Sequence, residues 1–92
     1  MITRDQAAQI ATDILRSKSE AGRYEVQYVV TVDEITWRRP HSGYGVDRDI
    51  LEDSWIAYLH DRTFVGLRSS TVLVLARNDG RLVYFGSAHD EG

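Results

Sequence analysis

The side chains of this sequence most able to do chemistry are four carboxylates within seven positions: Asp47, Asp49, Glu52 and Asp53. Several carboxylates in one flexible loop form the kind of ligand set that Ca²⁺ prefers. However, the segment lacks the Asp-x-Asp-x-Asp-Gly order and the later bidentate glutamate of an EF-hand loop, and Arg48 stands in its middle. We therefore expect no metal site here. A solvated acidic loop and a patch that contacts another protein both remain open.

Other residue types that often serve in catalysis or metal binding form no recognisable pattern. His41, His60 and His89 lack the H-x-x-x-H or H-x-H spacing that brings two imidazoles to one metal ion. The hydroxyls of residues 69–71 have no base that the sequence places within reach. The absence of Cys excludes thiolate chemistry, disulfides and Cys-ligated metals. We expect a protein that is not an enzyme and uses no cofactor.

Aromatic side chains are too numerous for one face of a small sheet to bury. Trp37 and Tyr44 lie close to the acidic cluster in the sequence, and others follow in the second half of the chain. Trp, Tyr and Arg are the residue types that most often anchor protein interfaces. An aromatic surface beside an acidic loop therefore favours a binding protein over an enzyme.

Length and composition set the broad class of the protein. The 92 residues suit one domain, residues 1–92, and 42% hydrophobic with 27% charged residues is ordinary globular composition. A net charge of −3 disfavours a nucleic-acid partner, which requires a basic surface. No apolar run reaches the roughly 18–20 residues that cross a membrane, and the first residues lack a signal-peptide pattern. The chain is therefore expected to be cytoplasmic.

The first element that these side chains depend on is an N-terminal helix. Thr3 and Gln6 have the spacing of a capping box, in which each side chain bonds the backbone of the other residue. Gly22 is expected to end the helix or the turn after it in a left-handed conformation. Between the capping box and Gly22, apolar residues recur with helical spacing on one face of the helix: Ala7, Ile10, Ala11, Ile14 and Leu15.

The pattern next changes to the alternation of a β-strand. A long strand is predicted over residues 24–32, with an extension possible toward Arg39 before Pro40 removes a backbone donor. An irregular segment follows, over residues 39–53, and it contains the whole acidic cluster. The expected buried face of this first strand consists of Tyr24, Val26, Tyr28, Val30 and Val32.

Three more strands are predicted at residues 54–60, 71–76 and 81–86. The last two form a hairpin through residues 77–80, where Gly80 supplies the positive φ of a bulged turn. The strand at 71–76 is apolar on both faces, so either the domain itself or a second copy must cover its outer side, and a homodimer is possible. The resulting fold class is α+β: an N-terminal helix packed on an antiparallel sheet of three to four strands, in the order α-β-β-β-β.

Short motifs in this order resemble the YrhB-like immunity-protein family. They are residues 53–58 (Asp-Ser-Trp-Ile-Ala-Tyr), Gly66, the apolar hairpin over residues 72–86 and the closing Gly-Ser-Ala of residues 86–88. The opening residues 2–7 are similar to the family's first helix as well. Two segments depart from the family pattern. Residues 40–52 resemble an insertion relative to shorter family members, and residues 61–70 match the family pattern incompletely.

The resemblance implies a small cytosolic binder that neutralises a cognate bacterial toxin without a cofactor. Some relatives resemble chaperones, so a small holdase is the alternative. On the immunity hypothesis the acidic residues steer the protein toward a basic toxin, and the aromatic residues provide buried anchors. The residues assigned to this surface are Trp37, Tyr44, Asp47, Asp49, Glu52 and Asp53.

Overall fold

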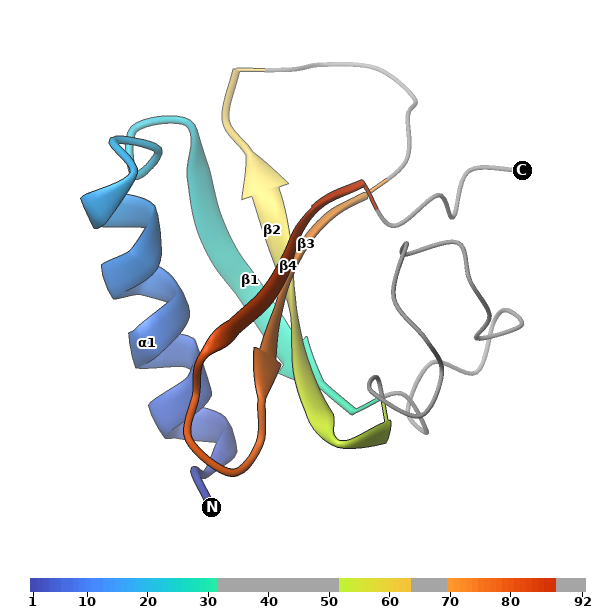
Figure 1. Cartoon of the computed structure of the whole chain (residues 1–92). Coiled ribbons are helices and arrows are strands. Elements are labelled where there is room, and N and C mark those ends of the chain that lie inside the picture. Colours follow the sequence, from blue (N-terminus) through green and yellow to red (C-terminus); the bar gives the residue numbers. More distant parts are fainter. Residues whose placement is uncertain (32–51, 64–69, 88–92) are drawn as a thin grey trace.

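The computed structural model describes residues 1–31, 52–63 and 70–87, which form a helix and a four-stranded antiparallel sheet (Figure 1). The strands lie in the sheet in their chain order, β1-β2-β3-β4, so each pairs with its neighbour in the sequence. This arrangement confirms the predicted α+β class and the order α-β-β-β-β. The predicted extension of the first strand toward Arg39 lies outside the described residues. The elements are α1 (Arg4–Ser17), β1 (Tyr24–Val30), β2 (Ser54–Asp61), β3 (Thr71–Ala76) and β4 (Leu82–Ser87).

Helix α1 begins with the predicted capping box. The Gln6 backbone N–H donates to Thr3 Oγ1 at 3.1 Å, and the Thr3 N–H donates to Gln6 Oε1 at 2.8 Å. Each bond satisfies a donor that the start of a helix would otherwise leave unpaired. The predicted apolar face is confirmed: Ala7, Ala11 and Leu15 are buried, and Ile10 and Ile14 pack partly buried against the same core.

The end of α1 differs from the prediction, because Ser19 and not Gly22 takes the left-handed conformation. Ser19 has φ 60°, and its N–H donates to the carbonyl of Arg16. The Glu20 N–H donates to the carbonyl of Leu15 at 2.8 Å. These two bonds form a Schellman motif, which closes the helix three residues earlier than a glycine at position 22 would.

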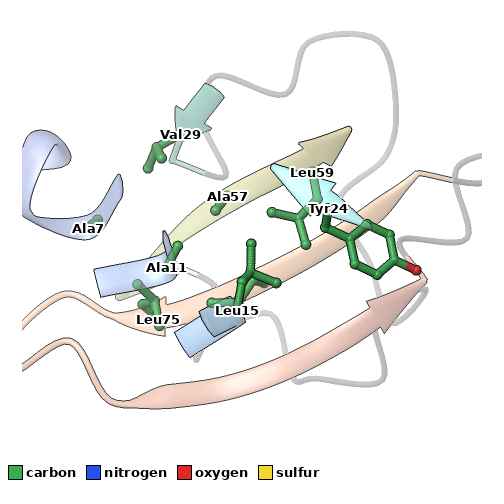
Figure 2. Packing of buried hydrophobic residues seen from close by; sticks show 9 residues of the cluster. Ala7, Ala11, Leu15, Tyr24, Val29, Ala57, Leu59 and Leu75 are labelled. Atoms are coloured by element: carbon green, nitrogen blue, oxygen red, sulfur yellow. The ribbon is translucent and has the colours of Figure 1, made fainter. Parts of the chain in front are cut away.

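The core lies between α1 and one face of the sheet. Figure 2 shows Ala11 and Leu15 of the helix directed at the strands, with Ala57 and Leu75 among the side chains that they meet. Alanines on both sides bring the helix backbone close to the sheet, and Leu73 is fully buried beneath them. This cluster holds most of the buried apolar side chains that oppose the entropy of folding.

The predicted buried face of the first strand is wrong at Tyr28 and Val30, because β1 contains a β-bulge, and Val32 lies outside the described residues. Val26 pairs with Leu59 but Tyr28 pairs with Tyr58, so Gln27 is an extra residue without an opposite partner. One extra residue turns every later side chain to the other face. Val29 therefore joins the core under the helix, while Tyr28 is 49% exposed on the opposite face.

The opposite face of the sheet carries a second apolar cluster. Ile56, Val72 and Val74 are 0% exposed, and the ring of Tyr58 packs against that of Tyr28 at a tilt of 55°, with the centroids 5.1 Å apart. The prediction that β3 is covered on both faces is confirmed. Because this burial is complete within one chain, it does not itself require the second copy that the sequence left open.

The β3–β4 turn requires glycine at position 80. Gly80 has φ +79°, as predicted, and its N–H donates to the carbonyl of Ala76 at 2.8 Å. A Cβ at this position would lie 2.7 Å from Ile10 Cδ1, so the turn also sits directly against the helix. Gly22, in contrast, is exposed, and a Cβ there would have no atom within 4 Å.

We predict that Gly80→Ala destabilises the protein by about 1–2 kcal/mol, the cost of a left-handed conformation for a residue with a Cβ. Ile10 must also shift to make room. Chemical denaturation monitored by circular dichroism measures the change. Gly22→Ala is the matched control and should change the free energy of unfolding by about 0.5 kcal/mol or less. Equal effects of the two substitutions would contradict this account of the turn.

A polar cluster joins the end of β2 to the start of β1. Asp61 accepts hydrogen bonds from the Thr63 N–H at 2.9 Å and from Thr63 Oγ1 at 2.8 Å, and it pairs with Arg23 Nη2 at 3.2 Å. Burial alone would raise the pKa of Asp61, but these hydrogen bonds and the Arg23 guanidinium outweigh it and lower the pKa from 3.8 to about 2.

A lowered pKa in the folded state means that the Asp61 carboxylate stabilises the fold above pH 3.8, and that this stabilisation is lost as the pH falls toward about 2. Asp61→Asn removes the titrating group. We predict that wild type is more stable than Asp61→Asn at pH 5 and that the difference shrinks steadily as the pH falls toward about 2. Urea unfolding of both proteins across this range measures it. A difference that does not change with pH would rule out this role of Asp61.

Candidate protein-binding surface

The structure describes two of the six residues predicted to form the binding surface. Glu52 and Asp53 immediately precede β2, and both side chains are exposed. Trp37, Tyr44, Asp47 and Asp49 lie outside the described residues. The described part of this surface therefore consists of Glu52, Asp53 and the residues that position them.

Arg77, in the turn after β3, holds the backbone of both acidic residues. Its N–H donates to the carbonyl of Asp53 at 2.9 Å, and its Nη1 donates to the carbonyl of Glu52 at 3.3 Å. The backbone at positions 52 and 53 is thus bonded to the β3–β4 hairpin, while the side chains face outward. A charged side chain on a fixed backbone loses less conformational freedom when a partner binds than one on an unattached loop.

Trp55 lies between two arginines in the same corner of the molecule. The Arg4 guanidinium lies 5.4 Å from the centroid of its ring and the Arg77 guanidinium 5.3 Å, both within the range of cation–π contacts. Trp55 Nε1 donates to the carbonyl of Ile2 at 3.2 Å, and the Ile2 N–H donates to the carbonyl of Arg77 at 2.8 Å. The start of the chain, β2 and the hairpin therefore meet at this tryptophan.

Arg77 makes these contacts at a cost. Its Nε is buried and has no hydrogen-bond partner among the described residues. A buried donor left without a partner costs about 1–3 kcal/mol. The contact of the guanidinium with the Trp55 ring and its bond to Glu52 offset part of this cost. Arg77 therefore holds the corner together through its ring contact and its backbone bonds.

An open hollow adjoins this corner and extends along the start of β4. Its lining includes Asp53, Arg77 and Arg81, and so residues of both signs of charge. Arg81 has a weak ion pair with Asp79 at 3.4 Å, and both side chains are more than half exposed. Such a lining can form ion pairs with both acidic and basic side chains of another protein. The uncharged residues that line the hollow include Ser54, Ala76, Asn78 and Val83.

Sequence reasoning identified Glu52 and Asp53 but not the residues that hold them. Arg4, Trp55 and Arg77 are far apart in the sequence, and no spacing rule relates a helix start to a hairpin turn. The only available signal was the abundance of arginine and aromatic side chains. The contact between them depends on the tertiary fold.

Metal-binding clusters and membrane-spanning helices do not occur in the described part of the chain. Within residues 1–31, 52–63 and 70–87, no three His, Asp or Glu side chains gather where they could hold a metal ion. His60 is exposed on β2, whereas His41 and His89 lie outside these ranges. Among the described helical residues, none belongs to a helix long and apolar enough to cross a membrane.

Comparisons with known proteins found no family model, no curated protein and no solved structure that matches this chain.

We predict that Trp55→Phe destabilises the protein by about 1 kcal/mol, because the carbonyl of Ile2 loses its hydrogen bond from the indole. The stronger effect should be local. Hydrogen exchange at the Ile2 N–H should become faster, since its segment loses one of its two anchors. The amide of Gln6, which the capping box protects, is the internal control. Unchanged exchange at Ile2 would show that the indole bond does not anchor this segment.

Proposed function

We propose that this chain is a non-enzymatic protein-binding module that binds and neutralises a cognate bacterial toxin, in the manner of an immunity protein. The observation that carries the proposal is the corner at the start of β2. There Arg77 holds the backbone of Glu52 and Asp53, whose side chains are exposed, beside a tryptophan that contacts two arginines. Trp and Arg are enriched among the residues that contribute most to protein interfaces.

Charge supports an acidic inhibitor of a basic target. The chain has a net charge of −3, and toxins that cleave nucleic acids need basic clefts to hold phosphates. Opposite charges raise the rate of association by steering the encounter. On this proposal Glu52 and Asp53 act with Asp47 and Asp49 in steering, and Trp37 and Tyr44 supply the anchors. The protein needs no cofactor and acts in the cytoplasm.

A chaperone-like holdase is supported less well. Such a protein needs a contiguous exposed apolar patch larger than a few hundred Å². Among the described residues, the exposed large apolar side chains are Met1, Tyr28 and Leu82. They belong to the N-terminal residues, to β1 and to β4, so they do not lie together on one element. This distribution favours a specific binder.

Affinity capture from the source lysate, followed by mass spectrometry, tests the function. The immunity proposal expects one stoichiometric partner with a basic domain. A broad set of substoichiometric clients would instead indicate a holdase. Failure to capture any stoichiometric partner at near-physiological salt would count against the proposal.

With the captured partner, we predict that Glu52→Lys/Asp53→Lys slows association by about tenfold or more at low salt and weakens its dependence on salt. Surface plasmon resonance measures both. The matched control is Asp13→Lys/Glu25→Lys, which makes the same change in net charge at exposed ion pairs elsewhere on the surface. Equal slowing by the two variants would attribute the effect to net charge alone and refute the assignment of the corner.

A further inference from the structure

Arg77 is a partly buried cation without a counter-charge. Among the described residues it forms no ion pair, and the hydrogen bond of its guanidinium is the long one from Nη1 to the carbonyl of Glu52, at 3.3 Å. Its Nε is buried and has no acceptor there. A guanidinium is rich in N–H donors, and buried donors without an acceptor are rare in native proteins. The side chain therefore has a positive charge and donors to offer to an acceptor that the described residues do not supply.

A second positive charge at the same hollow is only loosely held. Arg81 lines the hollow and pairs with Asp79 at 3.4 Å, and its side chain is 65% exposed. An exposed ion pair of this kind contributes little to stability. The Asp79 carboxylate also accepts the backbone N–H of Arg81 at 3.0 Å, a bond that does not involve the guanidinium. The Arg81 guanidinium can therefore leave Asp79 for another anion while the turn keeps this bond.

The charged side chains that line the hollow do not balance one another. Arg77 and Arg81 contribute two positive charges and Asp53 one negative charge. Within the described part of the chain, Asp53 forms no ion pair with either arginine. The exposed side chain of Asn78 adds neutral N–H donors to the same lining. A carboxylate balances this set, because it carries a single negative charge and fits the planar fork of a guanidinium.

The open shape of the hollow suits a side chain of another protein better than a free small molecule. Its volume is about 500 Å³, and it opens to solvent along the start of β4. Sites for small molecules enclose most of the surface of the ligand, which an open hollow does not. A side chain that belongs to a protein is instead held in place by the rest of the interface. The exposed side chains of Glu52 and Asp53, in the same corner, provide such an interface.

We propose that this hollow accepts the carboxylate of one Asp or Glu side chain of the protein partner, which becomes the counter-charge of Arg77 and Arg81. The identity of the occupant rests on the proposed function, because it belongs to the partner that this function requires. Basic residues of the partner then face Glu52 and Asp53, and one acidic residue among them enters the hollow. This alternation sets the register of the complex, since a uniformly basic surface would place like charges against both arginines.

Binding of a capped tripeptide to the protein alone tests the hollow. The probe is N-acetyl-Gly-Glu-Gly-amide at neutral pH, and the uncharged N-acetyl-Gly-Gln-Gly-amide is its control. The ¹H–¹⁵N spectrum of the labelled protein reports on the arginine Nε–H groups and on the asparagine side-chain amide. We expect the Glu peptide alone to cause saturable shifts at Arg77, Asn78 and Arg81, at millimolar concentration because single exposed ion pairs are weak. Equal shifts with both peptides, or shifts with neither, overturn the proposal.

Two substitutions should change this binding in opposite directions. Arg81→Gln removes one cation and should weaken binding of the Glu peptide about two- to fivefold, the range of one exposed ion pair. Asp53→Asn removes a repelling carboxylate and should strengthen binding by a similar factor. The matched control is Arg16→Gln: Arg16 is 66% exposed and also pairs with an aspartate at 3.4 Å, but it does not line the hollow. It should leave the affinity unchanged, and an equal loss with Arg16→Gln and Arg81→Gln would refute the site.

Inorganic phosphate is the competing anion, and it should bind no more tightly than the Glu peptide because Asp53 repels its second negative charge. Tighter binding of phosphate would overturn the assignment of a carboxylate. These measurements need no partner, so they separate this inference from the proposed function. A hollow that fails them while one basic partner is captured refutes the inference and leaves the function standing. Binding of the Glu peptide without any stoichiometric partner keeps the site and counts against the function.

Discussion

The contact between the alanine face of α1 and the middle of the sheet is the interaction on which the rest of the structure depends. Ala7 and Ala11 are 0% exposed, and their small side chains let the helix lie close to Ala57 and Leu73. That close approach determines where the helix starts relative to the strands. As a result the residues before the helix reach the β3–β4 hairpin, where the Ile2 N–H bonds the carbonyl of Arg77. The Trp55 corner is thus a consequence of helix packing as much as of its own side chains.

The bulge at Gln27 is the second constraint that shapes the molecule. Without it, Tyr28 would point under the helix, where the core already holds Val29 at 5% exposure. With it, the tyrosine turns to the other face and packs its ring against Tyr58, and both apolar faces of the sheet contain a β1 side chain. One inserted residue therefore determines which β1 side chains enter each of the two apolar clusters.

Local signals in the sequence were sufficient for most of the fold. The capping box at Thr3 and Gln6, the helical period of the apolar residues and the glycine of the β3–β4 turn each involve residues a few positions apart, and all were predicted correctly. The bulge and the Schellman motif at Ser19 were missed, because alternation continues through Gln27 in the sequence and serine rarely has positive φ. The Arg4–Trp55–Arg77 contact joins three distant segments, so only the assembled fold reveals it. Glu52 and Asp53 were identified by charge alone, and the way Arg77 holds their backbone was not.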